Sequence, residues 1–180
     1  LAMGLLAFGV AASAASGPDP QGAYRLITSV SDRMLSVLEA EGQALFDNPQ
    51  RVHQLVEQNL LPHIDFDHMS RLVLGKAWRR ATPEQRKRFT QEFRLFMVRF
   101  YTTSLLEYTR GNKIPGDAMR FLPLRAQSGD TKVTVRSEVR QPGGGQHIPV
   151  NYQFAVSAGQ WKVYDVGVDG VSLVANYRTS

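Results

Sequence analysis

The side chains best suited to chemistry form the segment HIDFDH, with His63, Asp65, Asp67 and His68. In an extended segment, alternation would place His63, Asp65 and Asp67 on one face, and these donor types bind divalent metals. Aspartates before an apolar helix instead accept hydrogen bonds from its first backbone N–H groups. We expect the second role, with the aspartates capping a helix and the histidines in solvent.

Two further carboxylates, Asp165 and Asp169, lie near the C-terminal end of the sequence. Strict strand alternation predicts that Asp165 shares a face with Trp161 and Val163. A carboxylate in an apolar cavity can serve as the base of an isomerase, whereas a carboxylate beside an arginine forms an ion pair. We expect the ion pair and keep the base as the alternative.

The glycine-rich segment GVDGVS, residues 167–172, follows a predicted strand. Such a segment can hold phosphate with its backbone N–H groups when it opens a helix. Within a series of antiparallel hairpins, a tight turn is the simpler interpretation. We expect this turn to lead into a helix with Ser172 near its N-terminus.

Composition excludes several classes of site. The 180 residues include no cysteine, which rules out disulfides, a cysteine nucleophile and thiolate zinc sites. Motifs of serine hydrolases, zinc proteases and P-loop proteins are absent, and His53 and His147 are isolated. We therefore predict no catalytic residue, no metal site and no enzyme. The formal net charge of +5 favours anionic binding partners.

The basic residues gather around one segment. This basic rim consists of Lys76, Arg79, Arg80, Arg86, Lys87 and Arg88. Such a cluster is either a solvated surface or a docking site for acidic proteins or lipid headgroups. Both interpretations stay open at this point.

Residues 1–10 form an uncharged apolar run, followed by small residues and the breaker GPDP. This order is typical of a secretory signal peptide with its cleavage site. We expect cleavage of residues 1–15, so that residues 16–180 form one exported domain. Export argues against nucleic acid as a partner and favours lipid and protein surfaces.

Residues 21–111 show helical periodicity. Apolar residues from Tyr24 onward predict a first helix of about six turns. The pair Asn48-Pro49 predicts the cap and first residue of a second helix. Thr82 with Gln85 forms a capping box that opens the longest helix, which Gly111 ends.

Residues 118–170 change to a period of two, with glycine turns between the runs. The predicted strands are Phe121–Gln127, Thr131–Arg140, Ile148–Ser157 and Gln160–Asp169. One face of each strand is apolar and the other polar, so the helices must cover the apolar face. We predict an α+β fold in which the helical half packs on a curved four-stranded antiparallel sheet.

Two ordered motifs resemble a known family. LGKAWR, ATPEQR and two phenylalanines lie within residues 74–93, and WKVYDV, DGVSLV and NYR lie within residues 161–178. Both are similar to motifs of periplasmic phospholipid-binding proteins of the MlaC, or toluene-tolerance, family. Family members usually have Glu in place of Asp169. They also continue past NYR with a helix, so we expect that the C-terminal helix is truncated here.

The resemblance implies an NTF2-like cone with an apolar cavity, and a soluble periplasmic carrier. Such a carrier moves glycerophospholipid between the outer and inner membranes and maintains outer-membrane lipid asymmetry. The implied partners are an outer-membrane lipoprotein–porin complex and an inner-membrane MCE-domain transporter complex. No cofactor is implied beyond the bound phospholipid cargo. The alternative is an envelope isomerase or hydrolase that uses the same cavity.

We expect acyl chains to bind between the aromatic stripe of the long helix and the apolar sheet face. The predicted lipid-binding residues are Phe93, Met97, Phe100, Tyr101, Leu105, Val133, Val135, Val150, Tyr152 and Phe154. Within the basic rim, the predicted partner-docking residues are Arg79, Arg80 and Arg88. Lipid headgroups are expected to stay in water at the mouth of the cavity.

Overall fold

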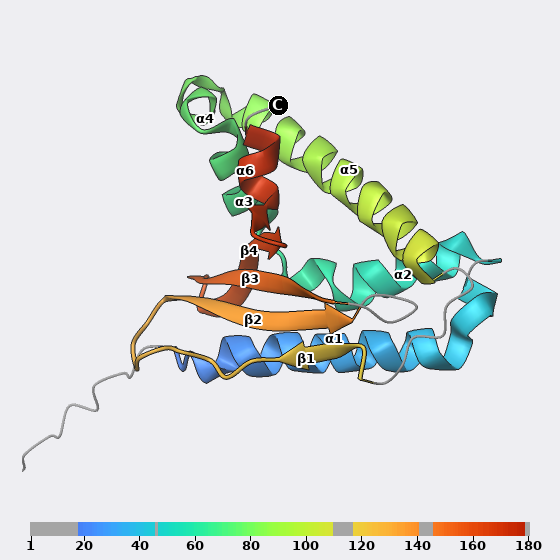
Figure 1. The fold of residues 1–180 in the computed structure, drawn as a ribbon. Coiled ribbons are helices and arrows are strands. Elements are labelled where there is room, and N and C mark those ends of the chain that lie inside the picture. Colours follow the sequence, from blue (N-terminus) through green and yellow to red (C-terminus); the bar gives the residue numbers. More distant parts are fainter. Residues whose placement is uncertain (1–17, 46, 110–116, 141–145, 179–180) are drawn as a thin grey trace, which may run out of the picture.

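The computed structural model describes residues 18–45, 47–109, 117–140 and 146–178 (Figure 1). The helices are α1 (Gln21–Glu41), α2 (Pro49–Asn59), α3 (Phe66–Leu74), α4 (Lys76–Arg80), α5 (Pro83–Thr109) and α6 (Leu173–Arg178), with 3₁₀ turns η1 (Gly42–Leu45) and η2 (Leu61–His63). The strands are β1 (Met119–Phe121), β2 (Lys132–Arg140), β3 (His147–Ser157), β4 (Gln160–Val168) and β5 (Val171–Ser172).

Two predicted features, the signal peptide and the helix end at Gly111, lie outside the described residues. Across the part of the chain that the structure describes, the helices lack the combination of length and hydropathy that crossing a bilayer requires.

Side-chain caps set the helix starts as the sequence predicts. Asn48 and Asp65 each accept a hydrogen bond from the backbone N–H three residues later, at 3.1 and 2.9 Å. Thr82 and Gln85 exchange two such bonds, of 3.2 and 2.9 Å, and so complete the capping box. The starts of α2, α3 and α5 are therefore determined locally.

The five strands form one sheet in the order β1-β2-β3-β4-β5, and all neighbours are antiparallel. This confirms the predicted α+β class, although four strands were expected. The expected first strand, Phe121–Gln127, is wrong because β1 covers Met119–Phe121 and residues 122–127 belong to no strand. Pro123 explains the early end, since it has no N–H for the ladder.

A β-bulge at Tyr164 interrupts the alternation of β4. Val163 lies opposite Phe154, and Asp165 lies opposite the adjacent Gln153, so Tyr164 has no partner in β3. The extra residue moves Asp165 to the face opposite Val163. The prediction that these two side chains share a face is therefore wrong.

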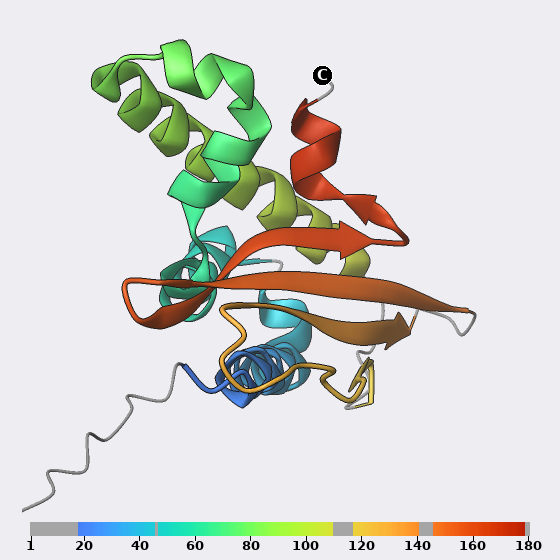
Figure 2. The same ribbon diagram turned by 90° about the vertical axis from the view of Figure 1, so that its left-hand side faces the viewer.

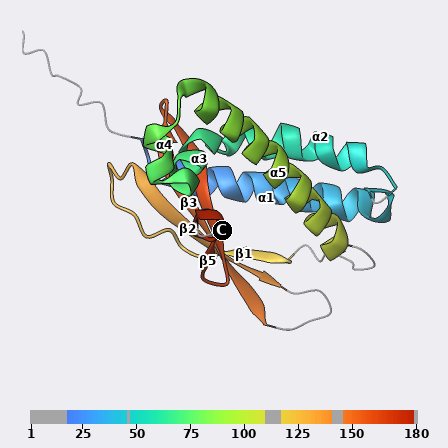
Figure 3. The same ribbon diagram turned by 90° about the horizontal axis from the view of Figure 1, so that it is seen from above.

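The helices lie on one side of the twisted sheet (Figures 1 and 3). Ala23 and Ile27 of α1 are buried in the same cluster as Val133, Val135 and Phe154 of the sheet. Figure 2 shows α1 near the β1 edge and α6 beyond β4, at the opposite end of the sheet. Helix α1 is therefore the part of the helical layer that closes the core onto the sheet, with direct contacts to β2 and β4.

Helix α5 packs mainly on α2 and α3, and rises away from the sheet in Figure 1. Phe93 and Met97 are buried with Met69 of α3 and Val174 of α6. The ring of Tyr177 in α6 meets that of Phe93 edge-on, with centroids 5.8 Å apart. These contacts hold α5 above the sheet and leave space between the two.

Candidate functional site

An apolar cavity of about 330 Å³ lies between the sheet and the helices. Its helical and loop wall consists of Leu26, Ile27, Val30, Val56, Leu60, Leu61, His63, Ile64, Phe66, Met69, Met97, Val98, Thr102 and Leu173. Its sheet wall consists of Val150, Tyr152, Phe154, Val163, Val166 and Val168. The volume falls in the range of small-molecule sites, roughly 300–1,000 Å³.

The polar side chains in this wall are those of His63, Thr102 and Tyr152. Burial raises the pKa of the Tyr152 phenol, so this hydroxyl is neutral at physiological pH. The Thr102 hydroxyl is buried and has no hydrogen-bond partner among the described residues. A wall with so little polarity favours hydrocarbon over any charged or strongly hydrogen-bonding ligand.

Four predicted lipid-binding residues line the cavity: Met97, Val150, Tyr152 and Phe154. They come from α5 and β3, the two surfaces that the sequence predicts to face each other. Phe93 lies beside them in the core formed by α3, α5 and α6 rather than in the wall.

The remaining predicted residues lie elsewhere. Val133 and Val135 are buried beneath α1, because that helix packs on the sheet face at β2. Phe100 is on the outer surface of α5. The side chains of Tyr101 and Leu105 lie outside the part of the chain described here.

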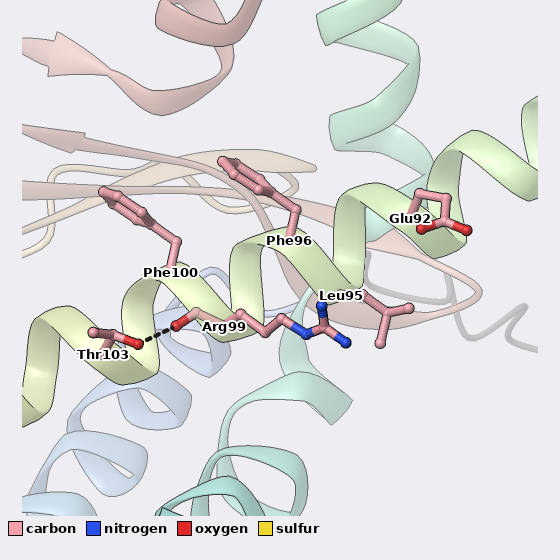
Figure 4. A pocket seen from close by; sticks show the side chains of 6 residues that line it. All are labelled: Glu92, Leu95, Phe96, Arg99, Phe100 and Thr103. Carbon is pink, nitrogen blue, oxygen red and sulfur yellow. Dashed lines mark hydrogen bonds between the residues drawn. The ribbon is translucent and has the colours of Figure 1, made fainter.

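Figure 4 shows α5 side chains that line an open surface pocket apart from the cavity, with Phe96 and Phe100 pointing to one side of the helix and Leu95 to another. Leu95, Phe96 and Phe100 are 47, 47 and 50% exposed, and the rings of Phe96 and Phe100 stack with centroids 6.1 Å apart. Met97 and Val98 are buried on the other side of the helix. The aromatic stripe predicted from the sequence therefore divides into two surfaces of α5, of which one faces the cavity and the other is exposed.

Sequence reasoning missed the contribution of α1 and of the segment after α2. Leu26, Ile27 and Val30 extend the wall along α1, and Leu61 and Ile64 close it beside β4. The signal for α1 was present in the three- and four-residue spacing of its apolar residues. The segment at Ile64 could not be found from periodicity, because a single parallel bridge to Val163 positions it.

The HIDFDH segment caps a helix as expected, but its histidines are not in solvent. His63 lines the cavity and is half-buried, and the His68 ring stacks on Tyr164 with centroids 4.4 Å apart. Burial lowers the pKa of both imidazoles below 6.5. Within the described ranges, no three His, Asp or Glu side chains are arranged to hold a metal ion.

Asp165 is part of a helix cap. Its carboxylate accepts hydrogen bonds from the Ser172 hydroxyl at 2.6 Å and from the Val174 N–H at 3.1 Å. Ser172 in turn accepts from the Ala175 N–H at 3.0 Å, which confirms the predicted turn into a helix. The expected ion pair with an arginine is not found among the described residues, and Asp165 points away from the cavity.

Two arginines lie over the ring of Trp78 in α4, and one of them, Arg86, belongs to the basic rim. The guanidinium groups of Arg71 and Arg86 lie 5.9 and 5.4 Å from its ring centre. Arg86 also donates to the Trp78 carbonyl at 2.9 Å, so this arginine has a structural role. Arg79, Arg80 and Arg88 have exposed side chains.

The fold and the cavity together define an α+β protein that encloses a binding site for apolar ligands. The family model described as MlaC protein matches residues 28–180. The chain therefore belongs to the MlaC family, as the two sequence motifs predict.

Two curated relatives and one solved structure carry informative descriptions. The toluene tolerance protein ttg2D of Pseudomonas putida is 28% identical over 156 residues, covering 86% of this chain and 69% of that protein. The intermembrane phospholipid transport system binding protein MlaC of Haemophilus influenzae is 26% identical over 173 residues, covering 94 and 76%. A phospholipid-binding protein from Ralstonia solanacearum, solved with a phospholipid, has a TM-score of 0.73 and 29% identity, covering 87 and 83%.

Proposed function

We propose that this chain is a periplasmic carrier that moves glycerophospholipid between the outer and inner membranes and so maintains outer-membrane lipid asymmetry. The observation that supports this most is the apolar cavity between α5 and β3. Each acyl CH₂ that leaves water for such a wall gains about 0.8 kcal/mol, on the order of 20 kcal/mol for two chains. A carrier needs an enclosed apolar site of this kind to compete with a bilayer.

The packing of α5 fits loading and unloading. Because α5 is held mainly by α2 and α3, the space between α5 and the sheet can widen without loss of strand pairing. The cavity in this structure then represents a contracted state, which expands as acyl chains enter. Release is the reverse process and requires no covalent step and no cofactor.

The two aspartates that the enzyme alternative requires as a base do not line the cavity. Asp165 is engaged by Ser172 and the start of α6, on the face of the sheet opposite the cavity. Asp169 is exposed in the turn between β4 and β5. Neither carboxylate is among the described residues of the wall, so the aspartate base that the isomerase interpretation requires is not found there.

The proposed partners are an outer-membrane lipoprotein–porin complex and an inner-membrane MCE-domain transporter complex, with export by a cleaved signal peptide. We assign docking to Arg79, Arg80 and Arg88, whose exposed side chains offer positive charge to acidic protein surfaces. Charge complementarity of this kind accelerates encounter more than it tightens the complex.

Lipid extraction followed by mass spectrometry tests the carrier proposal. Protein exported to the periplasm and purified without detergent is expected to contain glycerophospholipid in a fixed ratio to protein. An exported protein of similar size and charge without a cavity serves as the control. A lipid-free protein that also takes up no phospholipid from vesicles would overturn the proposal.

A further inference from the structure

One end of the cavity is bordered by basic side chains. His63, in η2, is half-buried and, among the described residues of the wall, is the one ionisable group that can carry positive charge. Its neighbour Pro62 is exposed, so His63 lies where the apolar wall meets the surface. This position is the end of the cavity at which a polar headgroup can reach water.

Arg33 extends the α1 side of the wall toward the same end. Leu26 and Val30 line the cavity, and Arg33 follows them at i+7 and i+3, which places it on the same helical face. Its side chain is exposed, and among the described residues it forms no ion pair. Its guanidinium therefore remains available to an anion at the outer end of the α1 wall.

Lys162 approaches His63 from the sheet. Its side chain leaves β4 on the face opposite Val163, and its ammonium group reaches η2 and donates a hydrogen bond to the carbonyl of Pro62. This bond fixes the lysine beside η2. Burial lowers the pKa of His63, and the positive charges of Lys162 and Arg33 lower it further.

We propose that Arg33, His63 and Lys162 form the seat of the lipid phosphate. This inference rests on the proposed carrier function and adds the position and chemistry of headgroup binding. A guanidinium binds two phosphate oxygens through parallel N–H groups, and an ammonium adds a point charge. The neutral imidazole of His63 donates one N–H to the same group. The acyl chains then extend from this seat into the wall formed by Val30 and Met97.

A matched pair of ligands separates phosphate recognition from chain binding. The probes are phosphatidylglycerol and diacylglycerol with identical acyl chains, presented in vesicles, and inorganic phosphate alone. The variants are Arg33→Gln, Lys162→Gln and the double variant. Arg125→Gln and Lys132→Gln are the controls, because both remove an exposed positive charge from the outer face of the sheet. Arg33→Gln alone alters an exposed side chain, so it provides a folded variant even if the double variant is unstable.

We expect wild-type protein and both controls to bind phosphatidylglycerol at least about tenfold more tightly than diacylglycerol. The double variant should lose this preference, and Arg33→Gln should lose part of it, while diacylglycerol binding changes less than about twofold. An unchanged preference in the folded variants would overturn the phosphate seat and leave the carrier function intact. Failure of the wild type to bind either lipid would overturn the carrier function itself.

The arm with inorganic phosphate distinguishes a lipid headgroup from a free anion. We expect phosphate alone to bind weakly and to be displaced by phosphatidylglycerol. If phosphate binds through Arg33 and Lys162 but phosphatidylglycerol does not displace it, the cluster is a separate anion site and the proposal is wrong.

Discussion

The Ser172 hydroxyl donates a 2.6 Å hydrogen bond to the Asp165 carboxylate. This bond joins β4 to the start of α6 and depends on the bulge at Tyr164, which turns Asp165 away from the cavity. Helix α6 in turn supports α5 through the ring of Tyr177. Strict strand alternation makes Asp165 a candidate base. In the structure its carboxylate instead positions α6 above the site.

Ser172→Ala tests the role of this cap. The substitution removes the donor to Asp165 and the acceptor for the Ala175 N–H, so we expect the free energy of unfolding to fall by about 1 kcal/mol. Ser36→Ala is the control, because Ser36 is exposed and, among the described residues, its hydroxyl bonds to the Asp32 carbonyl of its own helix alone. Urea unfolding of both variants measures the difference, and equal stabilities would contradict the assigned cap.

The docking arginines are expected to affect the rate of lipid transfer. Reversing Arg79, Arg80 and Arg88 to Glu should slow lipid transfer to the membrane-bound acceptor several-fold and leave lipid occupancy unchanged. Wild-type transfer should also slow with rising salt, because charges are screened over about 8 Å at physiological ionic strength. Stopped-flow transfer between labelled vesicles at several salt concentrations provides the measurement.

A second triple reversal provides the control for net charge. Arg125, Lys132 and Arg136 surround a depression on the outer face of the sheet, away from α4. Their reversal to Glu changes the total charge equally and should leave transfer close to the wild-type rate. Equal slowing by both triple variants would mean that only net charge matters, and docking through the basic rim would be wrong.

His63 predicts a pH dependence of stability. Burial, Lys162 and Arg33 lower its pKa in the folded protein below the usual 6.5. Well above pH 6.5 the imidazole is neutral in both states and contributes no pH dependence. As the pH falls below 6.5, the unfolded chain takes up the proton first, so the free energy of unfolding decreases.

The variant His63→Gln removes this proton uptake. We expect the loss of stability between about pH 7 and pH 5 to be smaller in the variant than in the wild type. Urea unfolding at three pH values measures it in lipid-free protein. If wild type and variant lose stability equally over this interval, His63 does not have a lowered pKa in the folded state.

Local signals were sufficient for much of the fold. The caps at Asn48, Asp65 and Thr82 could be read from sequence because each acts within three residues. The hairpin order followed from short glycine turns between apolar runs. Strand ends were less accurate, since the end of β1 at Phe121 depends on the following prolyl residue and on pairing with β2.

The site was harder to predict because its walls depend on tertiary contacts. Met97 and Phe154, which periodicity predicted as lipid-binding residues, line the cavity, but periodicity could not show that α1 covers Val135 and leaves Val150 open. Phe100 belongs to the same aromatic run as Met97 and yet lies on the outer surface. When an apolar stripe is wider than one face of a helix, the structure is needed to show which of its residues line the cavity and which lie on the outer surface.

The central claim is that phospholipid occupies the cavity between α5 and the sheet. Met97→Glu tests it directly, because Met97 is 6% exposed and lies in the cavity wall. Leu95→Glu is its control, because Leu95 is 47% exposed on the outer surface of α5. Val166→Trp adds a variant that fills the cavity without burying a charge, and Val171→Trp, 58% exposed in the wild type, is its control.

Native mass spectrometry of the exported proteins, checked for folding by circular dichroism, gives the lipid occupancy of each. We predict that Met97→Glu and Val166→Trp lower phospholipid occupancy at least about tenfold, whereas Leu95→Glu and Val171→Trp retain the wild-type level. Full occupancy in folded Met97→Glu and Val166→Trp proteins would contradict the proposed site.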